Sequence, residues 1–483
     1  MNTIIVTKIN EVFMTVDCED AGIKYELSDF FTFKVPGAEF MPTFRNKMWD
    51  GKIRLFNMWT SQLYIGLMEQ LEEFCKTRGY YLVGQDSAIP KQNISTEDIV
   101  KALVDLKLPF NPRNYQVDAI RDGVNDKRLV MLSPTGSGKS LIIYGLTQLG
   151  TSGRVLIVVP TTSLVEQMYK DFADYGYDVE NNCHRIYSGH DKDTDKRIVI
   201  TTWQSVYKLP KKWFAPFKMV IGDEAHLFKA TSLKTLMEKT ENAVMRFGTT
   251  GTLDDTKTHK LMLEGLFGPI RKFTTSKQLM KDGQLARLKI TCLMLNYNDE
   301  VRQANKKLTY QEEMDFLVSY VPRNNFIRNL ALEQKGNSLL LFQYVEKHGR
   351  ILYDMIKEKA KNRKVFFVHG GVDADTREDI RAITEKERDA IIVASYGTFS
   401  TGINIRNLHN IIFASPSKSK IRNLQSIGRG LRLGDDKDEA QLFDISDDMS
   451  WKQRTNYTLE HAVERIKIYN EEKFKYKTVK VKI

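Results

Sequence analysis

Long apolar runs are missing from this sequence of 483 residues. A helix that spans a bilayer needs about 20 consecutive apolar residues, and no run in this chain approaches that length. The opening residues, MNTIIVTKINEV, also lack the charged start, apolar core and small-residue cleavage site of a secretory signal. The sequence therefore predicts neither a membrane span nor secretion.

Cysteine is scarce as well. Cys18, Cys75, Cys183 and Cys292 are far apart and form no CxxC pair. Such spacing does not favour a disulfide framework or a structural zinc site. We expect a reducing, cytosolic compartment.

Acidic residues are outnumbered by basic ones, 61 to 72, which gives a formal charge of +11. This excess favours a polyanionic partner such as nucleic acid. Charge alone is equally consistent with a simple role in solubility.

Short apolar runs recur from about residue 129 to residue 445. They are RLVML, VLIVVP, RIVITT, FKMVIGDEA, SLLLF, KVFFVHG, AIIVAS, NIIFAS and AQLFDI. Each has the length of a strand, and helix-length mixed sequence usually separates one run from the next. Continuous hydrophobicity of this kind is typical of strands buried on both faces of a parallel sheet. The runs fall into two sets, which predicts two α/β domains joined by a linker near residues 281–289.

The first 85 residues have alternating strands instead, together with one amphipathic segment. In GLMEQLEEFCKTRG (66–79), the residues Leu67, Leu71, Phe74 and Cys75 form an apolar stripe, and Gly79 is a plausible helix stop. This pattern predicts a small α+β domain. The expected domains are residues 1–90, 91–283 and 284–465, with a basic C-terminal tail at 466–483.

A candidate phosphate-binding loop, SPTGSGKS, occupies residues 133–140 between an apolar run and a helix-like segment. In such a turn Gly136 and Gly138 let the backbone N–H groups approach a phosphate chain. Lys139 supplies charge to the β- and γ-phosphates, and the Ser140 hydroxyl can bind Mg²⁺. The strict pattern begins with glycine, whereas Ser133 stands here, so a chance Gly/Ser turn is the alternative.

Acidic residues close a later strand in IGDEAH, residues 221–226. Asp223 can hold Mg²⁺, and Glu224 can orient and deprotonate the attacking water. In the second set of runs, QSIGRGLR (425–432) places Arg429 and Arg432 on one side of a helix, where they could stabilise charge on a transferring phosphate. The alternative for that helix is an exposed basic face.

Taken together, these segments resemble superfamily 2 helicases of the DEAH-box-like type. The resemblance covers about residues 100–445 and rests on RNYQ, SPTGSGKS, VPTTSLVEQ, TTWQS, DEAH, TGT, LLFQYVEKHGRIL, VASYGTFSTGINI and QSIGRGLR, in that order. It implies two tandem RecA-like P-loop domains with parallel sheets. It also implies ATP and Mg²⁺ as cofactors, with Lys139, Asp223, Glu224, Gln425, Arg429 and Arg432 in catalysis and Ser140 and Asp223 at the metal.

The same resemblance assigns binding residues. Those for the nucleotide are Arg113, Tyr115, Gln116, Thr135, Gly136, Ser137, Gly138, Lys139, Ser140, Gly402 and Asn404. Those for the nucleic-acid strand are Pro160, Thr161, Thr202, Gln204 and Thr398. Two departures from the family pattern matter. In TGT, Gly251 stands where the family usually has alanine. The segment VASYGTFSTGINI is one residue longer between Ser395 and Gly402 than the RNA-helicase form, which leaves Ser395, Thr398 and Thr401 open as contacts to the nucleic-acid strand.

A closer resemblance links the chain to the UvsW family, the recombination and repair helicases of T-even bacteriophages. It rests on FRNKMWDGKIRLF, TSKQLMKDGQ, LTYQEE, VASYGTFSTGIN and RIKIYNEEKFKY, and it extends over nearly the whole chain. It implies an ATP-driven enzyme in the cytoplasm of a bacterial host that acts on duplex and branched DNA and on RNA–DNA hybrids. An RNA helicase, a motor subunit of a restriction-type complex and a non-enzymatic nucleic-acid-binding protein remain the alternatives.

The stretch FRNKMWDGKIRLF (44–56) predicts a β-hairpin, because Asp-Gly is a strong two-residue turn signal. The expected pairing sets Lys47 opposite Arg54, a repulsion that an intervening phosphate would relieve. Six residues would share the DNA-facing side: Arg45, Lys47, Trp49, Lys52, Arg54 and Phe56. Phe44, Met48, Ile53 and Leu55 would pack on the helix of residues 66–79. The alternative is a solvated face.

The ending KFKYKTVKVKI (473–483) alternates lysine with apolar or aromatic residues. It predicts either an arm that grips a nucleic-acid backbone or an edge strand whose lysines discourage aggregation.

Overall fold

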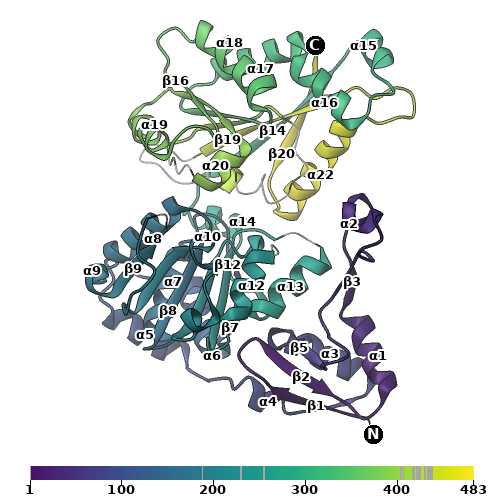
Figure 1. Cartoon of the computed structure of the whole chain (residues 1–483). Helices are drawn as coiled ribbons and strands as arrows, with labels where there is room; N and C mark the ends of the chain where they lie inside the picture. Colours follow the sequence, from purple (N-terminus) through teal and green to yellow (C-terminus); the bar gives the residue numbers. More distant parts are fainter. Residues whose placement is uncertain are drawn as a thin grey trace. The chain divides into compact units, whose positions relative to one another are not determined.

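The computed structural model describes residues 2–187, 189–228, 231–253, 256–402, 405, 407–415, 419, 426–428, 431 and 439–483. The chain divides into two compact units: Met1–Ser133 with Gly138–Thr274, and Pro134–Ser137 with Thr275–Ile483. The first unit holds a small α+β region and a parallel α/β sheet, and the second holds another parallel α/β sheet (Figure 1). The predicted fold class is therefore confirmed.

The N-terminal region is built on a four-stranded sheet of order β5-β2-β1-β6. Its strands are β1 (Thr3–Lys8), β2 (Phe13–Asp17), β5 (Gln62–Tyr64) and β6 (Tyr81–Val83), and its helices are α1 (Ala21–Phe30), η2 (Ile65–Leu67), α3 (Met68–Arg78) and α4 (Gln85–Ala88). In β1 the side chains of Ile4 and Val6 are buried whereas Ile5 is half exposed, as expected for a sheet with one face on a core. The predicted stripe of residues 66–79 is buried, and Gly79 ends α3 with a φ of 70°.

The predicted hairpin of residues 44–56 is wrong in its pairing. Asp50-Gly51 does not form a two-residue hairpin turn: β4 (Lys52–Arg54) pairs with β3 (Thr32–Lys34) instead of residues 45–49, and residues 35–51 connect the two strands. The intervening chain forms η1 (Ala38–Phe40) and α2 (Pro42–Arg45), because Pro42 suits the first turn of a helix. We call residues 32–54 the arm; η1 and α2 lie at its far end (Figure 1).

The side-chain assignments in this stretch change accordingly. Phe56, predicted to face DNA, is 2% exposed in the core, and Met48, predicted to pack, is 78% exposed. Arg54 does not face Lys47; it forms an ion pair with Asp50 at 2.5 Å. Leu55 is buried, as predicted.

The first parallel sheet has the order β13-β7-β12-β11-β8-β10-β9. Its strands are β7 (Arg128–Leu132), β8 (Arg154–Val159), β9 (Cys183–Ile186), β10 (Ile198–Thr202), β11 (Phe217–Asp223), β12 (Met245–Thr250) and β13 (Ile270–Lys272). The helices are α5 (Thr96–Asp105), α6 (Asn114–Asp126), α7 (Lys139–Leu149), α8 (Thr162–Asp174), α9 (Val179–Asn182), α10 (Trp203–Val206), α11 (Lys211–Phe214), η3 (Ala225–Leu227), α12 (Thr231–Lys239) and α13 (Lys257–Phe267). The four apolar runs predicted for this region are β7, β8, β10 and β11.

The second parallel sheet has the order β16-β17-β15-β18-β19-β14-β20. Its strands are β14 (Arg287–Asn296), β15 (Ser338–Phe342), β16 (Val365–Val368), β17 (Ile391–Ser395), β18 (Asn410–Phe413), β19 (Glu439–Asp448) and β20 (Tyr476–Lys482). The helices are α14 (Ser276–Lys281), α15 (Asp299–Ala304), α16 (Tyr310–Ser319), α17 (Val321–Glu333), the π-helix η4 (Val345–Arg350), α18 (Ile351–Lys359), α19 (Ala374–Lys386), α20 (Tyr396–Gly402) and α22 (Tyr457–Glu471). All five apolar runs predicted here are strands of this sheet.

The C-terminal residues belong to this second sheet and do not form a separate tail. Helix α22 crosses the predicted boundary at residue 465, and β20 pairs with β14 at the sheet edge. Of the two interpretations of KFKYKTVKVKI, the edge strand is therefore the one observed.

The α+β region is joined to the first parallel sheet by polar contacts within the same unit. Arg128 is 3% exposed at the start of β7, and its guanidinium lies 2.5 Å from the Glu11 carboxylate of the α+β region. Gln70 of α3 donates a hydrogen bond to Glu264 of α13 at 2.8 Å. Close packing accompanies these contacts, because a Cβ on Gly66 would lie 2.1 Å from the Glu264 carbonyl oxygen.

Glu264 makes this junction sensitive to pH. Burial raises its pKa from 4.5 to about 7. Protonation of Glu264 therefore contributes to the free energy of unfolding. This contribution is complete below the unfolded pKa of 4.5 and is lost as pH rises through 7. The Glu264→Gln variant keeps the neutral form, so its melting temperature should exceed that of the wild type by a margin that grows from about pH 5 to about pH 8. The exposed Glu73→Gln variant is the control, and a margin that does not change with pH would contradict the assignment.

Candidate active site

The loop SPTGSGKS connects the end of β7 to the start of α7. Gly136 and Gly138 have φ angles of 85° and 75°, in the left-handed region that favours glycine. The Ser133 N–H donates to the Thr250 carbonyl at 2.9 Å, which ties the loop to β12. Helix α7 begins at Lys139, and its first N–H groups provide the anion-binding end of a helix. The geometry is that of a phosphate cradle.

The upstream segment RNYQ lies against this loop. Gln116 is 4% exposed, its side-chain oxygen accepts from the Arg113 N–H at 2.8 Å, and its amide donates to the Gly138 carbonyl at 3.4 Å. A Cβ at Gly138 would lie 2.5 Å from that amide nitrogen, so glycine is required there for steric reasons too. Arg113 also donates to the Tyr115 hydroxyl at 2.8 Å. Gln116 is therefore in contact with the loop, and Arg113 and Tyr115 lie next to it in the same segment.

Asp223 ends β11, the strand that follows β12 in the sheet order. Its Oδ1 accepts from the Thr249 hydroxyl at 2.7 Å and from the Glu224 N–H at 2.9 Å. Burial raises the pKa of Asp223, as does the neighbouring Glu224 charge, whereas Lys139 acts in the opposite direction. Lys139 and Asp223 are thus close enough to interact. The Asp223 carboxylate and the hydroxyl of Ser140, the residue after Lys139, are hard oxygen donors of the kind that Mg²⁺ prefers.

Glu224 has an unusual backbone. Its φ and ψ angles are 52° and 51°, a left-handed conformation that costs a non-glycine residue about 1 kcal/mol or more. The carboxylate lies 3.4 Å from Nδ1 of His226, and the same nitrogen lies 3.0 Å from the Thr250 hydroxyl. Thr250 donates in turn to the Thr252 carbonyl at 2.9 Å. The DEAH and TGT segments therefore form one hydrogen-bonded network, with Gly251 inside it.

Two contacts at this site were not predicted from the sequence. Thr249 holds Asp223 because the two residues are paired on neighbouring strands, which only the sheet order reveals. Tyr175, the residue after α8, has its hydroxyl 2.8 Å from the Ser140 hydroxyl. It is far from the loop in sequence, and no motif marks it.

The residues predicted to contact a nucleic-acid strand lie at the carboxyl ends of β8 and β10. These strands are neighbours, with Thr202 paired with Val159. Thr161, which follows Pro160, is the N-cap of α8. The Thr202 hydroxyl forms a hydrogen bond with the Ser205 hydroxyl, and Gln204 is exposed. The carboxyl ends of parallel strands share one sheet edge, so these residues lie on the same edge as the phosphate loop.

In the second unit, Thr398 is 7% exposed and accepts a hydrogen bond from Ser395 at 2.9 Å. Because its side chain is buried, Thr398 is poorly placed to contact a nucleic-acid strand in this conformation. Gly402 is the last residue of α20. Asn404, Gln425, Arg429 and Arg432 lie outside the described residues, as does the Thr401 side chain. Their assigned roles remain predictions.

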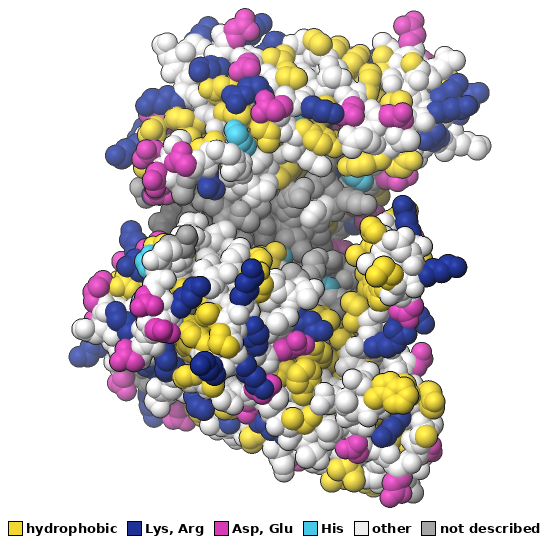
Figure 2. Space-filling view, viewed as in Figure 1, with side chains coloured by type: hydrophobic (Ala, Val, Ile, Leu, Met, Phe, Trp, Pro, Cys, Tyr) yellow, Lys and Arg dark blue, Asp and Glu magenta, His cyan; other side chains and the backbone are white. Residues whose placement is uncertain are grey.

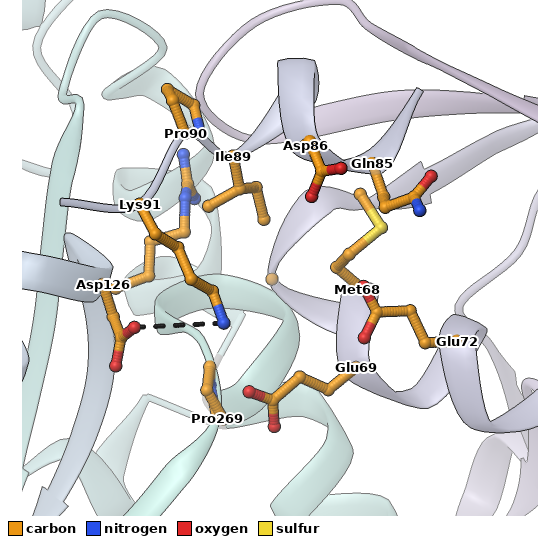
Figure 3. Close-up of a pocket in the computed structure, with 12 residues that line it drawn as sticks. Met68, Glu69, Glu72, Gln85, Asp86, Ile89, Pro90, Lys91, Asp126 and Pro269 are labelled. Carbon is orange, nitrogen blue, oxygen red and sulfur yellow. Dashed lines mark ion pairs between the residues drawn. The ribbon is translucent and has the colours of Figure 1, made fainter. Parts of the chain in front are cut away.

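A separate pocket of about 480 Å³ lies between α3, α4 and the amino-terminal end of β7 (Figure 3). Its walls combine Met68 and Ile89 with the carboxylates of Glu69, Glu72 and Asp126. Because β7 has its phosphate loop at the opposite end, this pocket is not the nucleotide site.

The two parallel α/β units and the loop–carboxylate site define an ATP-driven helicase core. Comparison with protein families agrees. Residues 109–255 match "Type III restriction enzyme, res subunit", residues 322–434 match "Helicase conserved C-terminal domain", and residues 7–84 match "DNA helicase UvsW, N-terminal".

Individual relatives are more specific. The ATP-dependent DNA helicase uvsW of Enterobacteria phage T4 is 37% identical over 486 residues, which cover 95% of this chain and 96% of the relative. The crystal structure of T4 UvsW matches 99% of both chains with a TM-score of 0.53 and 35% identity. The chain therefore belongs to the UvsW family of ATP-dependent DNA helicases. A DNA-bound Type ISP restriction-modification enzyme, LlaBIII, is 18% identical with a TM-score of 0.57 over 78% of this chain, which shows a shared fold.

Among the helices in the described ranges, none has the length and apolar character needed to cross a membrane.

Proposed function

We propose that this helicase uses Mg²⁺ and ATP to move on branched DNA, including forks, four-way junctions and RNA–DNA hybrids, in the cytoplasm of an infected bacterium. The proposed use of ATP and Mg²⁺ rests on one observation: Lys139, Asp223 and the amino terminus of α7 cluster at the carboxyl ends of the strands of the first parallel sheet. The residues at the ends of β8 and β10 share that edge, which supports coupling between nucleotide and strand.

Each residue has a role in this mechanism. The α7 amino terminus and Lys139 bind the phosphates, and Glu224 orients and accepts a proton from the attacking water. Ser140 and Asp223 would hold Mg²⁺, which neutralises charge on the phosphates when bound. We assign Arg429 and Arg432 to the transferring phosphate, where each positive charge stabilises the transition state. Successive ATP cycles then shift two sets of backbone contacts along the strand.

The arm supports branched DNA as the substrate. Phe40, Met41 and Met48 are 70%, 45% and 78% exposed at its end. At the α2 end of the arm, Lys and Arg side chains lie next to apolar ones (Figure 2). Apolar side chains next to phosphate-binding charges can unstack bases at a junction. In the antiparallel pair β3–β4 of the arm, Lys34 lies directly opposite Lys52. The two positive charges repel each other, and a bound phosphate would relieve this repulsion.

ATPase stimulation tests the proposal. Single-stranded, duplex, forked and four-way DNA of equal nucleotide content should give increasing rates, with branched forms the most effective. Stronger stimulation by RNA would favour an RNA helicase. Equal rates with and without any nucleic acid would contradict the proposed coupling.

The arm makes a separate prediction. Replacing Lys34 and Lys52 by alanine should weaken binding to four-way DNA and lower the slope of log affinity against log salt by about 2, since each lysine releases about one counterion. The exposed pair Lys76→Ala with Lys101→Ala matches the change in net charge and should have little effect. An unchanged slope in the arm variant, or an equal change in the control, would remove the arm from the interface.

A further inference from the structure

Ser140 is the residue that this site offers to a metal as a neutral ligand, and its hydroxyl is already engaged. The Ser140 Oγ lies 2.8 Å from the Tyr175 hydroxyl. Tyr175 follows the carboxyl end of α8, whereas Ser140 lies in the first turn of α7. The contact therefore joins the phosphate loop to the end of α8. This helix belongs to none of the three segments predicted to bind the nucleotide, which are SPTGSGKS, IGDEAH and RNYQ.

Tyr175 has little freedom to move. It is 9% exposed, and its ring packs against Tyr144 at 5.3 Å and edge-to-face against Phe110 at 5.7 Å between centroids. Tyr144 is itself 3% exposed on α7. Because the phenol packs between the buried Tyr144 ring and the Phe110 ring, these contacts restrict the position of its hydroxyl oxygen.

A fixed partner changes what Ser140 can offer to a metal. A serine hydroxyl has one proton and two lone pairs, and it rotates freely unless a neighbour orients it. When the proton points to the Tyr175 oxygen, the lone pairs remain available to a cation. Side chains that orient ligands in this way raise metal affinity by about 10- to 100-fold in known sites.

We propose that Tyr175 is a positioning residue that orients the Ser140 hydroxyl for Mg²⁺ and thereby tunes the metal dependence of nucleotide binding. This rests on the proposed function, since it presupposes that ATP and Mg²⁺ meet at the loop. Tyr175 touches neither group itself; it acts through Ser140.

The test measures nucleotide binding and not turnover. A fluorescent ATP analogue is titrated with Mg²⁺ against the full chain, and the half-saturating Mg²⁺ concentration is read. The Tyr175→Phe variant keeps both ring contacts and loses only the hydroxyl. Its half-saturating concentration should rise about 10-fold. In a Ser140→Ala background the same substitution should have no further effect, because the two residues act as one unit.

Tyr177→Phe is the matched control. Tyr177 packs on the same Tyr144 ring at 5.9 Å, but its hydroxyl accepts a hydrogen bond from Arg197. It should leave the Mg²⁺ dependence unchanged. Wild-type dependence in Tyr175→Phe, or an equal shift in Tyr177→Phe, would overturn the proposal while the proposed function stands. Wild-type binding with no Mg²⁺ dependence would overturn both.

Discussion

The Lys139→Ala variant should lose ATP hydrolysis by roughly 10²- to 10³-fold or more, the range found when one charge-stabilising donor is removed from a transition state. Lys139 begins α7 and lies close enough to Asp223 to affect that carboxylate's pKa. In the proposed mechanism the substitution removes the ammonium that binds the β- and γ-phosphates. Phosphate release in the presence of four-way DNA measures the effect.

The control for this variant is Lys101→Ala, an exposed lysine on α5 of the same unit. It should hydrolyse ATP at the wild-type rate and melt at the same temperature. Wild-type turnover by Lys139→Ala would show that SPTGSGKS is only a structural turn.

The Glu224→Gln variant should bind ATP and fail to hydrolyse it. The amide keeps the shape of the side chain and cannot accept the proton of the attacking water, a loss of about 10²- to 10⁴-fold in rate. The left-handed backbone at this position and the neighbouring His226 remain in place. After removal of free nucleotide, the protein should retain ATP, whereas the wild type should retain ADP or none.

Glu97→Gln on α5 is the matched control, since Glu97 is exposed and distant in sequence from the site. Normal turnover by Glu224→Gln would transfer the role of base to another residue. Loss of ATP binding in that variant would instead show that Glu224 supports the loop and not the water.

The two sheets could be predicted because their strands are buried on both faces. RLVML becomes β7 and SLLLF becomes β15, and runs of this kind admit few other structures. Strands β9, β12, β13 and β14 were not predicted, and β20 was predicted only as one of two alternatives for its segment. Polar residues interrupt several of them: β9 is CHRI, and β20 is a lysine-rich edge strand.

The arm shows where local signals fail. Gly51 has a φ of 76°, yet Asp50-Gly51 does not form the predicted two-residue turn, because residues 35–51 connect β3 to β4. The choice of partner strand depended on the core, because Phe31 and Leu55 flank the ribbon and are both buried. Burial of Phe31 and Leu55 sets β3 against β4. The paired residues are about 20 positions apart in the sequence, and a two-residue turn motif cannot reveal such a pairing.

Within the candidate site, the sequence motifs assigned the loop, Gln116 and Asp223 to one site. In the structure Gln116 contacts Gly138 of the loop, and Asp223 is close enough to Lys139 to interact with it. Thr249 and Tyr175 could not be found in this way. Thr249 depends on the pairing of β11 with β12, and Tyr175 depends on the packing of three aromatic rings. Residues that position others carry no motif of their own, because any helix end that reaches the site can supply them.

The most direct measurement of the central claim is ATP-dependent conversion of a labelled four-way DNA junction. The wild-type chain should convert the junction to forked or duplex products with ATP and Mg²⁺, and should leave it intact with a non-hydrolysable analogue or after Lys139→Ala. A wild-type protein that binds the junction and hydrolyses ATP, yet leaves every junction intact, would contradict the account.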